Sequence, residues 1–117
     1  MRIAESERSI MTVLWENGPT TAKEIAAVLN RRIGWSKTTT YTVLKRCIDK
    51  GYVLREEPRF VCTALLTKAM VADMETEALL KNNYNGSADL LVAALVGKKK
   101  LNAEDIKKLY DILKEAE

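Results

Sequence analysis

The stretch "SKTTTYTVLKRCIDKG", Ser36 to Gly51, carries the boundary signals of a short helix. Ser36 is a good N-cap residue, and Gly51 stands where a glycine commonly ends a helix. Threonine nevertheless fills four of the five positions from 38 to 42, although its β-branched side chain makes it a mediocre helix former. We therefore expect a helix whose threonine side chains, each with a hydroxyl and a methyl group, belong to a surface that contacts a partner molecule.

Helical periodicity divides this stretch into two faces. The predicted core face consists of Thr40, Val43, Leu44, Cys47 and Ile48. The opposite face carries Thr38, Thr42 and Lys45, with Tyr41 and Arg46 on its flanks. Threonine offers a hydroxyl for phosphates or base edges and a methyl for the thymine methyl group, and cationic side chains pair with phosphates. Contact with DNA is one interpretation of this face, and a capped, partly exposed helix start is the other.

Two further helices are predicted before this one. The first lies within Glu5–Glu16 and ends at Gly18-Pro19. Its apolar side chains at helical spacing are Ile10, Met11, Val13, Leu14 and Trp15. The second opens with a capping box, "TAKE", at Thr21 to Glu24, and Asn30 and Gly34 bracket its end. Its predicted core face consists of Ile25, Val28 and Leu29, with Ala26 and Ala27 beside them.

Two short strand-like runs follow the third helix. Tyr52–Arg55 and Phe60–Thr63 flank a tight turn at Glu56–Arg59, which is typical of a hairpin. Three helices followed by a hairpin is the order of a winged helix-turn-helix. The predicted fold class is therefore mainly α with a small β-hairpin wing, and Arg59 at the tip is a candidate phosphate contact, offset by Glu56 and Glu57.

The rest of the chain is predicted to be helical. A helix over Thr67–Tyr84 carries the stripe Met70, Val71, Met74 and Ala78, and Asn85-Gly86 ends it. The run "LLVAALV", Leu90 to Val96, is apolar on every side, and such a helix must be buried all round. A second copy of the chain is a natural cover, so we expect a homodimer. Asn102 is expected to cap a final helix. The candidate dimerisation residues on these C-terminal helices are Met74, Leu90, Leu91, Ala94, Leu95, Ile106, Leu109, Tyr110 and Leu113. The expected domains are residues 1–66 and 67–117.

Charge supports the same division. Residues 1–63 hold eleven Lys/Arg against seven Asp/Glu, whereas residues 64–117 hold eight against nine. An excess of cations in the half with the threonine-rich helix has two interpretations of equal weight, a polyanionic partner such as double-stranded DNA and a solvated basic surface. The candidate DNA-binding residues are Ser36, Lys37, Thr38, Thr39, Tyr41, Thr42, Lys45, Arg46 and Arg59.

Several classes of function are disfavoured. The chain has no histidine, the commonest general base, and no nucleophile motif or paired-carboxylate signature, so we do not expect an enzyme. Cys47 and Cys62 are not spaced for a metal site, and we interpret them as small buried side chains; no cofactor or metal is expected. No apolar run nears the roughly 20 residues that span a bilayer. The start, "MRIAESERS", lacks the core of a signal peptide, so the expected location is cytoplasmic.

Three segments together resemble the penicillinase-repressor family of bacterial winged-helix regulators, the BlaI/MecI/CopY group. They are "SERSIMTVLWENGPTTAKEIAAVL", "GWSKTTTYTVLKRCIDKGYV" and "YNGSADLLVAALVGKKKLNAEDIKKLYDIL". The resemblance implies a homodimer that binds a palindromic operator and blocks transcription. It also implies that the third helix reads bases, that the hairpin is the wing and that the C-terminal helices dimerise.

The sequence departs from the family pattern in several respects, and one of them is a short wing with only Glu56 to Arg59 at its tip. Well-known members carry a lysine and an arginine at the positions of Thr38 and Tyr41, so the operator sequence does not carry over. Antibiotic-responsive members are cut by a sensor protease at an Asn-Phe bond, which falls at Ala94-Leu95 here. The copper-responsive branch uses paired C-terminal cysteines, and this chain has none after Cys62. Relief by a sensor protease and relief by a small-molecule inducer both stay open.

Two other readings compete with an operator-binding repressor. A MarR- or PadR-like winged-helix regulator would sense a small ligand directly, in an apolar pocket near the dimer core. A winged-helix adapter would bind protein and would show no affinity for duplex DNA at low salt.

Overall fold

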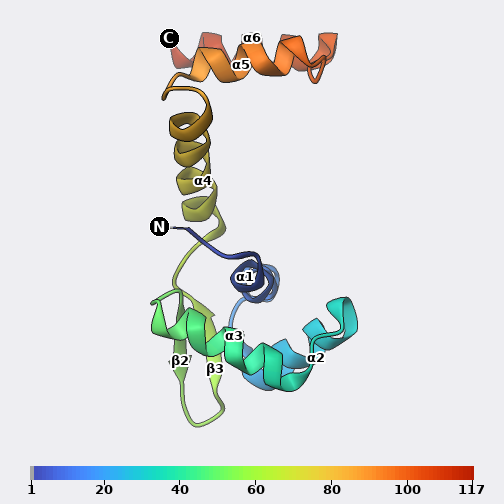
Figure 1. Cartoon of the computed structure of the whole chain (residues 1–117), viewed down its shortest axis with the longest axis vertical. Helices are drawn as coiled ribbons and strands as arrows, with labels where there is room; N and C mark the ends of the chain where they lie inside the picture. The colour runs from blue at the N-terminus through green and yellow to red at the C-terminus, as the bar shows by residue number, and fades with distance from the viewer. Residues whose placement is uncertain (1) are drawn as a thin grey trace. The chain divides into compact units, whose positions relative to one another are not determined.

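The computed structural model describes residues 2–117, which form two compact units. The first ends at Glu75, and the second runs from Thr76 to Glu117. The elements in chain order are α1 (Glu5–Asn17), β1 (Thr20–Thr21), α2 (Ala22–Ile33), α3 (Lys37–Asp49), β2 (Val53–Glu56), β3 (Val61–Ala64), α4 (Lys68–Asn83), α5 (Ala88–Gly97) and α6 (Ala103–Ala116) (Figure 1).

The core of the first unit forms where α1, α2 and α3 pack together. The helical spacing predicted most of it: the buried apolar side chains of these helices are Ile10, Met11, Val13, Leu14, Ala22, Ile25, Ala26, Leu29, Val43, Leu44 and Cys47. Two positions assigned to core faces, Val28 and Ile48, are only half-buried, and Ala27, which was placed beside the core face of the second helix, is exposed. Val28 and Ile48 lie at the edges of the apolar faces of their helices, whereas Ala27 lies about 200° around α2 from the core residue Ile25.

Both cysteines are free and buried, as interpreted from the sequence. Burial raises the pKa of Cys47 to about 12 and that of Cys62 to about 11. Both thiols therefore stay protonated near neutral pH and act as small apolar side chains in the core.

The sheet contains one strand more than the sequence indicated. The two predicted strands are present, each shifted by one residue, as β2 and β3. The third strand, β1, lies between α1 and α2 and pairs antiparallel with β3, so the strand order is β1-β3-β2. A two-residue strand shows no alternation to detect, which explains why it was missed. Its pairing ties the start of α2 to the wing.

The caps of α3 are as predicted. The Ser36 Oγ accepts a hydrogen bond from the Thr39 N–H at 3.1 Å, and Gly51 has a positive φ of 79°. The second helix shows one half of the predicted capping box, in which the Thr21 hydroxyl accepts from the Glu24 N–H at 3.2 Å. It continues through Asn30 to Ile33, and Gly34 closes it with a φ of 72°.

The predicted stripe of α4 is correct in part. Val71 is buried and Met74 is half-buried against the core, whereas Met70 and Ala78 are exposed, contrary to prediction. A helix that packs on one neighbour buries a narrower stripe than periodicity suggests. Beside the start of α4, the Trp15 Nε1–H donates to the Leu66 carbonyl at 2.8 Å.

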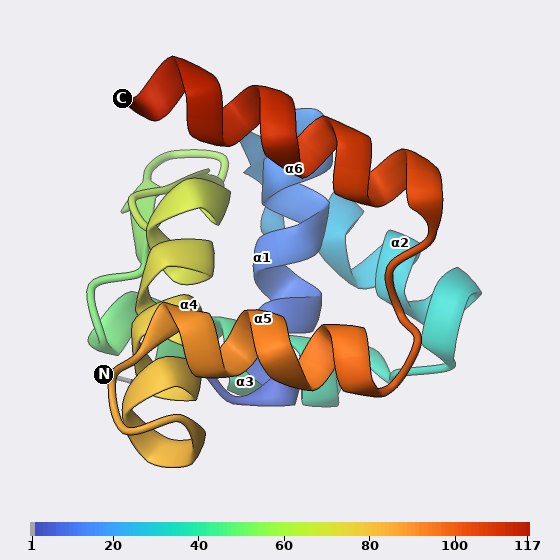
Figure 2. The same ribbon diagram turned by 90° about the horizontal axis from the view of Figure 1, so that it is seen from above.

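The second unit comprises the end of α4 together with α5 and α6, and it has no buried interior. Helices α5 and α6 run in opposite directions and are joined by the segment 98–102 (Figure 2). Asn102 caps α6 as predicted, with its Oδ1 accepting from the Asp105 N–H at 2.8 Å. None of the residues 76–117 is buried. The all-round burial expected of Leu90–Val96 is therefore not achieved within one chain.

The architecture confirms the predicted fold class, a mainly helical winged helix-turn-helix followed by C-terminal helices. The first turns of α4 belong to the first compact unit, which ends at Glu75. The expected boundary at residue 66 concerns DNA binding and dimerisation and stays a prediction. No helix within residues 2–117 is both long and apolar enough to cross a membrane.

Candidate nucleic-acid interface

The outward face of α3 gathers five of the predicted DNA-binding residues. Together they line one open hollow of about 420 Å³, and they are Lys37, Thr38, Tyr41, Thr42 and Lys45. Four of them are exposed, and Tyr41 is half-buried. The hollow has cationic and hydroxyl-bearing walls and no carboxylate in its lining, which suits a polyanion.

The hydroxyl of Thr42 is already engaged in part. It donates to the Thr38 carbonyl one turn earlier, at 2.9 Å. A hydroxyl has one donor hydrogen and two acceptor lone pairs, so Thr42 retains its acceptors and its methyl for a partner. In a major groove it can accept from an exocyclic amine or pack on a thymine methyl group.

Ser36 and Thr39 are occupied in capping the helix. Besides accepting from the Thr39 N–H, the Ser36 hydroxyl donates to the Thr39 Oγ1 at 3.0 Å. Both side chains are exposed, yet each already has a partner in the cap. Their structural role is to hold the α3 N-terminus, where the free backbone N–H groups can meet a phosphate.

The two cations near the end of α3 differ in surroundings. The Lys45 ammonium lies 3.4 Å from Asp49, and both side chains are largely exposed, so this pair is weak and Lys45 remains accessible. Arg46 is turned toward α1 instead. Its guanidinium donates to the Ser6 hydroxyl at 3.3 Å and lies 3.6 Å from a Glu7 oxygen.

Glu7 is a buried anion that sequence reasoning missed. Its Oε1 accepts from the Ala4 N–H at 2.9 Å, and its Oε2 lies 2.7 Å from the Lys50 ammonium. Burial by itself would raise the pKa of Glu7. The contacts with Lys50 and the Ala4 N–H and the charges of Lys50 and Arg46 outweigh it, and they hold the pKa below its ordinary value. The carboxylate thus links α1 to the C-terminal end of α3.

The wing carries fewer free charges than its sequence suggests. The Arg55 Nε lies 2.5 Å from a Glu57 oxygen, so these two charges pair with each other. Arg59 is exposed at the turn, where it lines a hollow with Glu56, Glu57, Pro58 and Val61. Within residues 2–117, no carboxylate is paired with Arg59, which leaves its guanidinium accessible to a phosphate.

A second hollow adjoins the α3 N-terminus. It measures about 280 Å³ and is lined by Lys23, Ala26, Ala27, Asn30 and Lys37. Lys23 and Asn30 were not among the predicted DNA-binding residues. The signal that could have identified Lys23 is its position in the first turn of α2, since the first helix of a helix-turn-helix crosses the DNA backbone.

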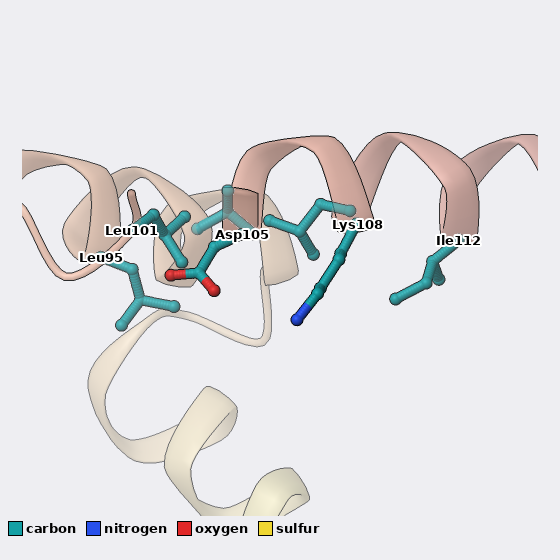
Figure 3. Close-up of a pocket in the computed structure, with 7 residues that line it drawn as sticks. Leu95, Leu101, Asp105, Lys108 and Ile112 are labelled. Carbon is teal, nitrogen blue, oxygen red and sulfur yellow. The ribbon is translucent and has the colours of Figure 1, made fainter. Parts of the chain in front are cut away.

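Four of the nine predicted dimerisation residues are exposed, and five are partly covered within one chain. Leu90, Ile106, Tyr110 and Leu113 are exposed. The remaining five are half-buried: Met74, Leu91, Ala94, Leu95 and Leu109. An open hollow of about 370 Å³ lies between α5 and α6, lined by Val92, Leu95, Leu101, Asp105, Lys108, Leu109 and Ile112. Figure 3 shows Asp105, Lys108 and Ile112 pointing to the same side of α6.

Comparison with known families gives a decisive match. The model of the family described as penicillinase repressor matches residues 3–115, nearly the whole chain. The chain belongs to the penicillinase repressor family. This family consists of DNA-binding transcriptional repressors and not of enzymes, which confirms the predicted class of function.

Two curated relatives agree with this membership. The chain is 28% identical over 116 residues to the penicillinase repressor of Bacillus licheniformis, covering 97% of this chain and 91% of that protein. It is 25% identical over 113 residues to an uncharacterized 16.5 kDa protein of Latilactobacillus sakei, covering 95% and 77%.

Among solved structures, the chain is similar to the F-93 protein of SSV1 and to a probable transcriptional regulator from Pseudomonas aeruginosa. Each has a TM-score of 0.47, with 19% and 16% sequence identity. The similarity covers 72% of this chain and 97% of the first structure, and 98% and 79% for the second. The fold of this penicillinase repressor family member is therefore assigned from its own helices and strands and not from these two structures.

Proposed function

We propose that this protein represses transcription as a homodimer that binds a palindromic operator through α3. The observation that carries the proposal is an open hollow whose lining contains Lys37, Lys45 and two threonines and no carboxylate. Lysines there pair with phosphates, and the threonines face the base edges. A repressor of this kind acts where the bacterial chromosome lies, in the cytoplasm.

A homodimer is supported by the open apolar surface of the second unit. Val96 is 53% exposed, Leu113 is 63% exposed and Tyr110 is 67% exposed, although all three belong to apolar helix faces. Leaving so much apolar surface in water forgoes about 25 cal/mol for every Å² that could be buried. A second copy would cover the same residues, since a two-fold interface uses one patch twice. In this proposal, residues 1–66 bind DNA and residues 67–117 dimerise.

The DNA-binding proposal is tested by selecting duplexes from a random pool and measuring affinity against salt. If each dimer neutralises roughly six to eight phosphates, the slope of log affinity against log salt is about −5 to −7. Lys45→Ala should weaken binding to all sequences alike, because it removes a phosphate partner. Lys107→Ala, on the exposed surface of α6, is the matched control and should change nothing. A slope near zero, or no duplex affinity at low salt, would favour a protein-binding adapter instead.

A further inference from the structure

Phe60 occupies the junction between the wing and the helix-turn-helix. It lies at the end of the turn after β2, and its φ of 53° places a bulky residue in the left-handed region, which such residues rarely adopt. Its carbonyl accepts a hydrogen bond from the Ala22 N–H, the first of α2, at 3.0 Å. Backbone conformations of this kind persist where the surroundings hold them.

Two side chains hold the Phe60 ring. The Arg55 guanidinium from β2 lies over the ring, 3.6 Å from its centroid, and is itself paired with Glu57. From α3, Tyr41 meets the ring edge-to-face, with centroids 5.9 Å apart and planes at 68°. Both arrangements are favourable for aromatic rings, and they join the wing to α3 through three side chains.

Tyr41 is therefore engaged within the protein. It is half-buried, and the Lys37 ammonium lies 5.5 Å from the centroid of its ring. The sequence placed Tyr41 among the DNA-binding residues, on the flank of the outward face. The ring contact with Phe60 leaves the hydroxyl as the part of Tyr41 through which it could touch DNA.

We propose that Tyr41, Phe60 and Arg55 form a wing clasp that fixes the hairpin against α3. In this role Tyr41 is a positioning residue that acts through Arg59 at the tip of the wing, and it does not read bases. The inference rests on the proposed function, because it assumes that Arg59 meets a DNA phosphate while α3 lies in the groove. The clasp keeps these two contacts at one fixed separation, so that both form in the same complex.

The test is a double-mutant cycle on DNA affinity measured against salt. Arg59→Ala should reduce the slope of log affinity against log salt by about 0.9 for each phosphate that is no longer neutralised. Phe60→Ala should reduce it by the same amount, because a loose wing no longer delivers Arg59. The double variant should show no further reduction. If the two reductions add, or if Phe60→Ala leaves the slope unchanged, the clasp does not act through Arg59.

Two variants of Tyr41 separate positioning from direct contact. Tyr41→Phe keeps the edge-to-face contact and should bind as wild type does. Tyr41→Ala removes the ring, suits a helix better than tyrosine and should reproduce the Phe60→Ala slope even where Phe60→Ala folds poorly. An equal loss of affinity in Tyr41→Phe and Tyr41→Ala, measured at one salt concentration, would show that the hydroxyl touches DNA and would overturn the proposal.

The outcome for the clasp is separable from that for the proposed function. If wild-type protein shows no salt-dependent duplex affinity, the proposed function itself fails. If wild type binds with a steep slope and the Tyr41 and Phe60 variants do not differ from it, the clasp inference alone is wrong.

Discussion

At the scale of single residues, Thr40 illustrates the energetic cost of burying a threonine hydroxyl in the core. It is fully buried in α3, and its hydroxyl has no hydrogen-bond partner within residues 2–117. Thr40→Val keeps the shape and removes the unpaired hydroxyl, so it should raise the free energy of unfolding by about 1 kcal/mol. Urea unfolding measures the change. Thr40→Ala, which leaves a cavity, should lower the same quantity, and a loss of stability in Thr40→Val would mean that the hydroxyl has a partner.

Glu7 gives a prediction that depends on pH. Because its folded pKa lies below its ordinary value, its contribution to stability is present above about pH 4.5 and is lost as the pH falls through the lowered folded pKa. Glu7→Gln keeps an oxygen for the Ala4 N–H but removes the charge that faces Lys50 and Arg46. It should lower the free energy of unfolding at pH 7 by about 1–3 kcal/mol.

The control for Glu7 is an ion pair of the same chemistry at the surface. Glu16 lies 2.8 Å from Arg32, and both side chains are about half exposed. Glu16→Gln should change the free energy of unfolding by less than about 1 kcal/mol. The difference in the free energy of unfolding between wild type and Glu7→Gln should shrink as the pH is lowered below about 4.5, through the lowered pKa of Glu7. A difference of constant size across that range would contradict the assignment.

At the scale of elements, α6 offers a substitution that should disrupt the proposed dimer without unfolding the single chain. Leu91 and Leu95 in α5 are half-buried within one chain, so a charge at either position would also disturb the helix pair. Leu113 is 63% exposed in the single chain, and Leu113→Glu therefore places no charge in an existing core. It should split the dimer while the helices remain, because the partner's apolar surface would have to desolvate the carboxylate.

Sedimentation at micromolar concentration and far-ultraviolet circular dichroism measure the two effects. Lys107→Glu, which changes an exposed residue of the same helix, should sediment as wild type does. A wild-type protein that sediments as a monomer at this concentration would rule out the proposed homodimer.

Sequence periodicity predicted the elements whose signals come from residues close together in the chain. Helices α1, α2 and α3 were recognisable because their buried faces repeat every three to four residues, and α2 and α3 also begin with the hydroxyl-bearing caps Thr21 and Ser36. Strand β1 was not recognisable, since its two residues gain their role from pairing with a distant strand. Glu7 and the contact between Tyr41 and Phe60 were missed for the same reason. Each depends on residues far apart in the chain, which no local pattern reveals.

At the scale of the whole molecule, a helix proposed to read DNA is combined with C-terminal helices whose apolar side chains are exposed. Family membership supplies the class of function, DNA-binding repression. The structure supplies the surface proposed to read DNA, with Thr38 and Thr42 outward and Thr40 in the core. The central claim is therefore about orientation: the outward threonines of α3 face the base edges.

The most direct test selects duplexes from a random pool with wild type and with Thr42→Ala. Alanine preserves the helix and the net charge, so non-specific affinity should not change. Wild type should enrich one inverted repeat, and Thr42→Ala should bind it more weakly by about 1 kcal/mol or more and relax the preference at one position of each half-site. Thr40→Val should select the same repeat as wild type. If Thr42→Ala retains the wild-type preference and Thr40→Val alters it, the contact face of α3 has been assigned to the wrong side.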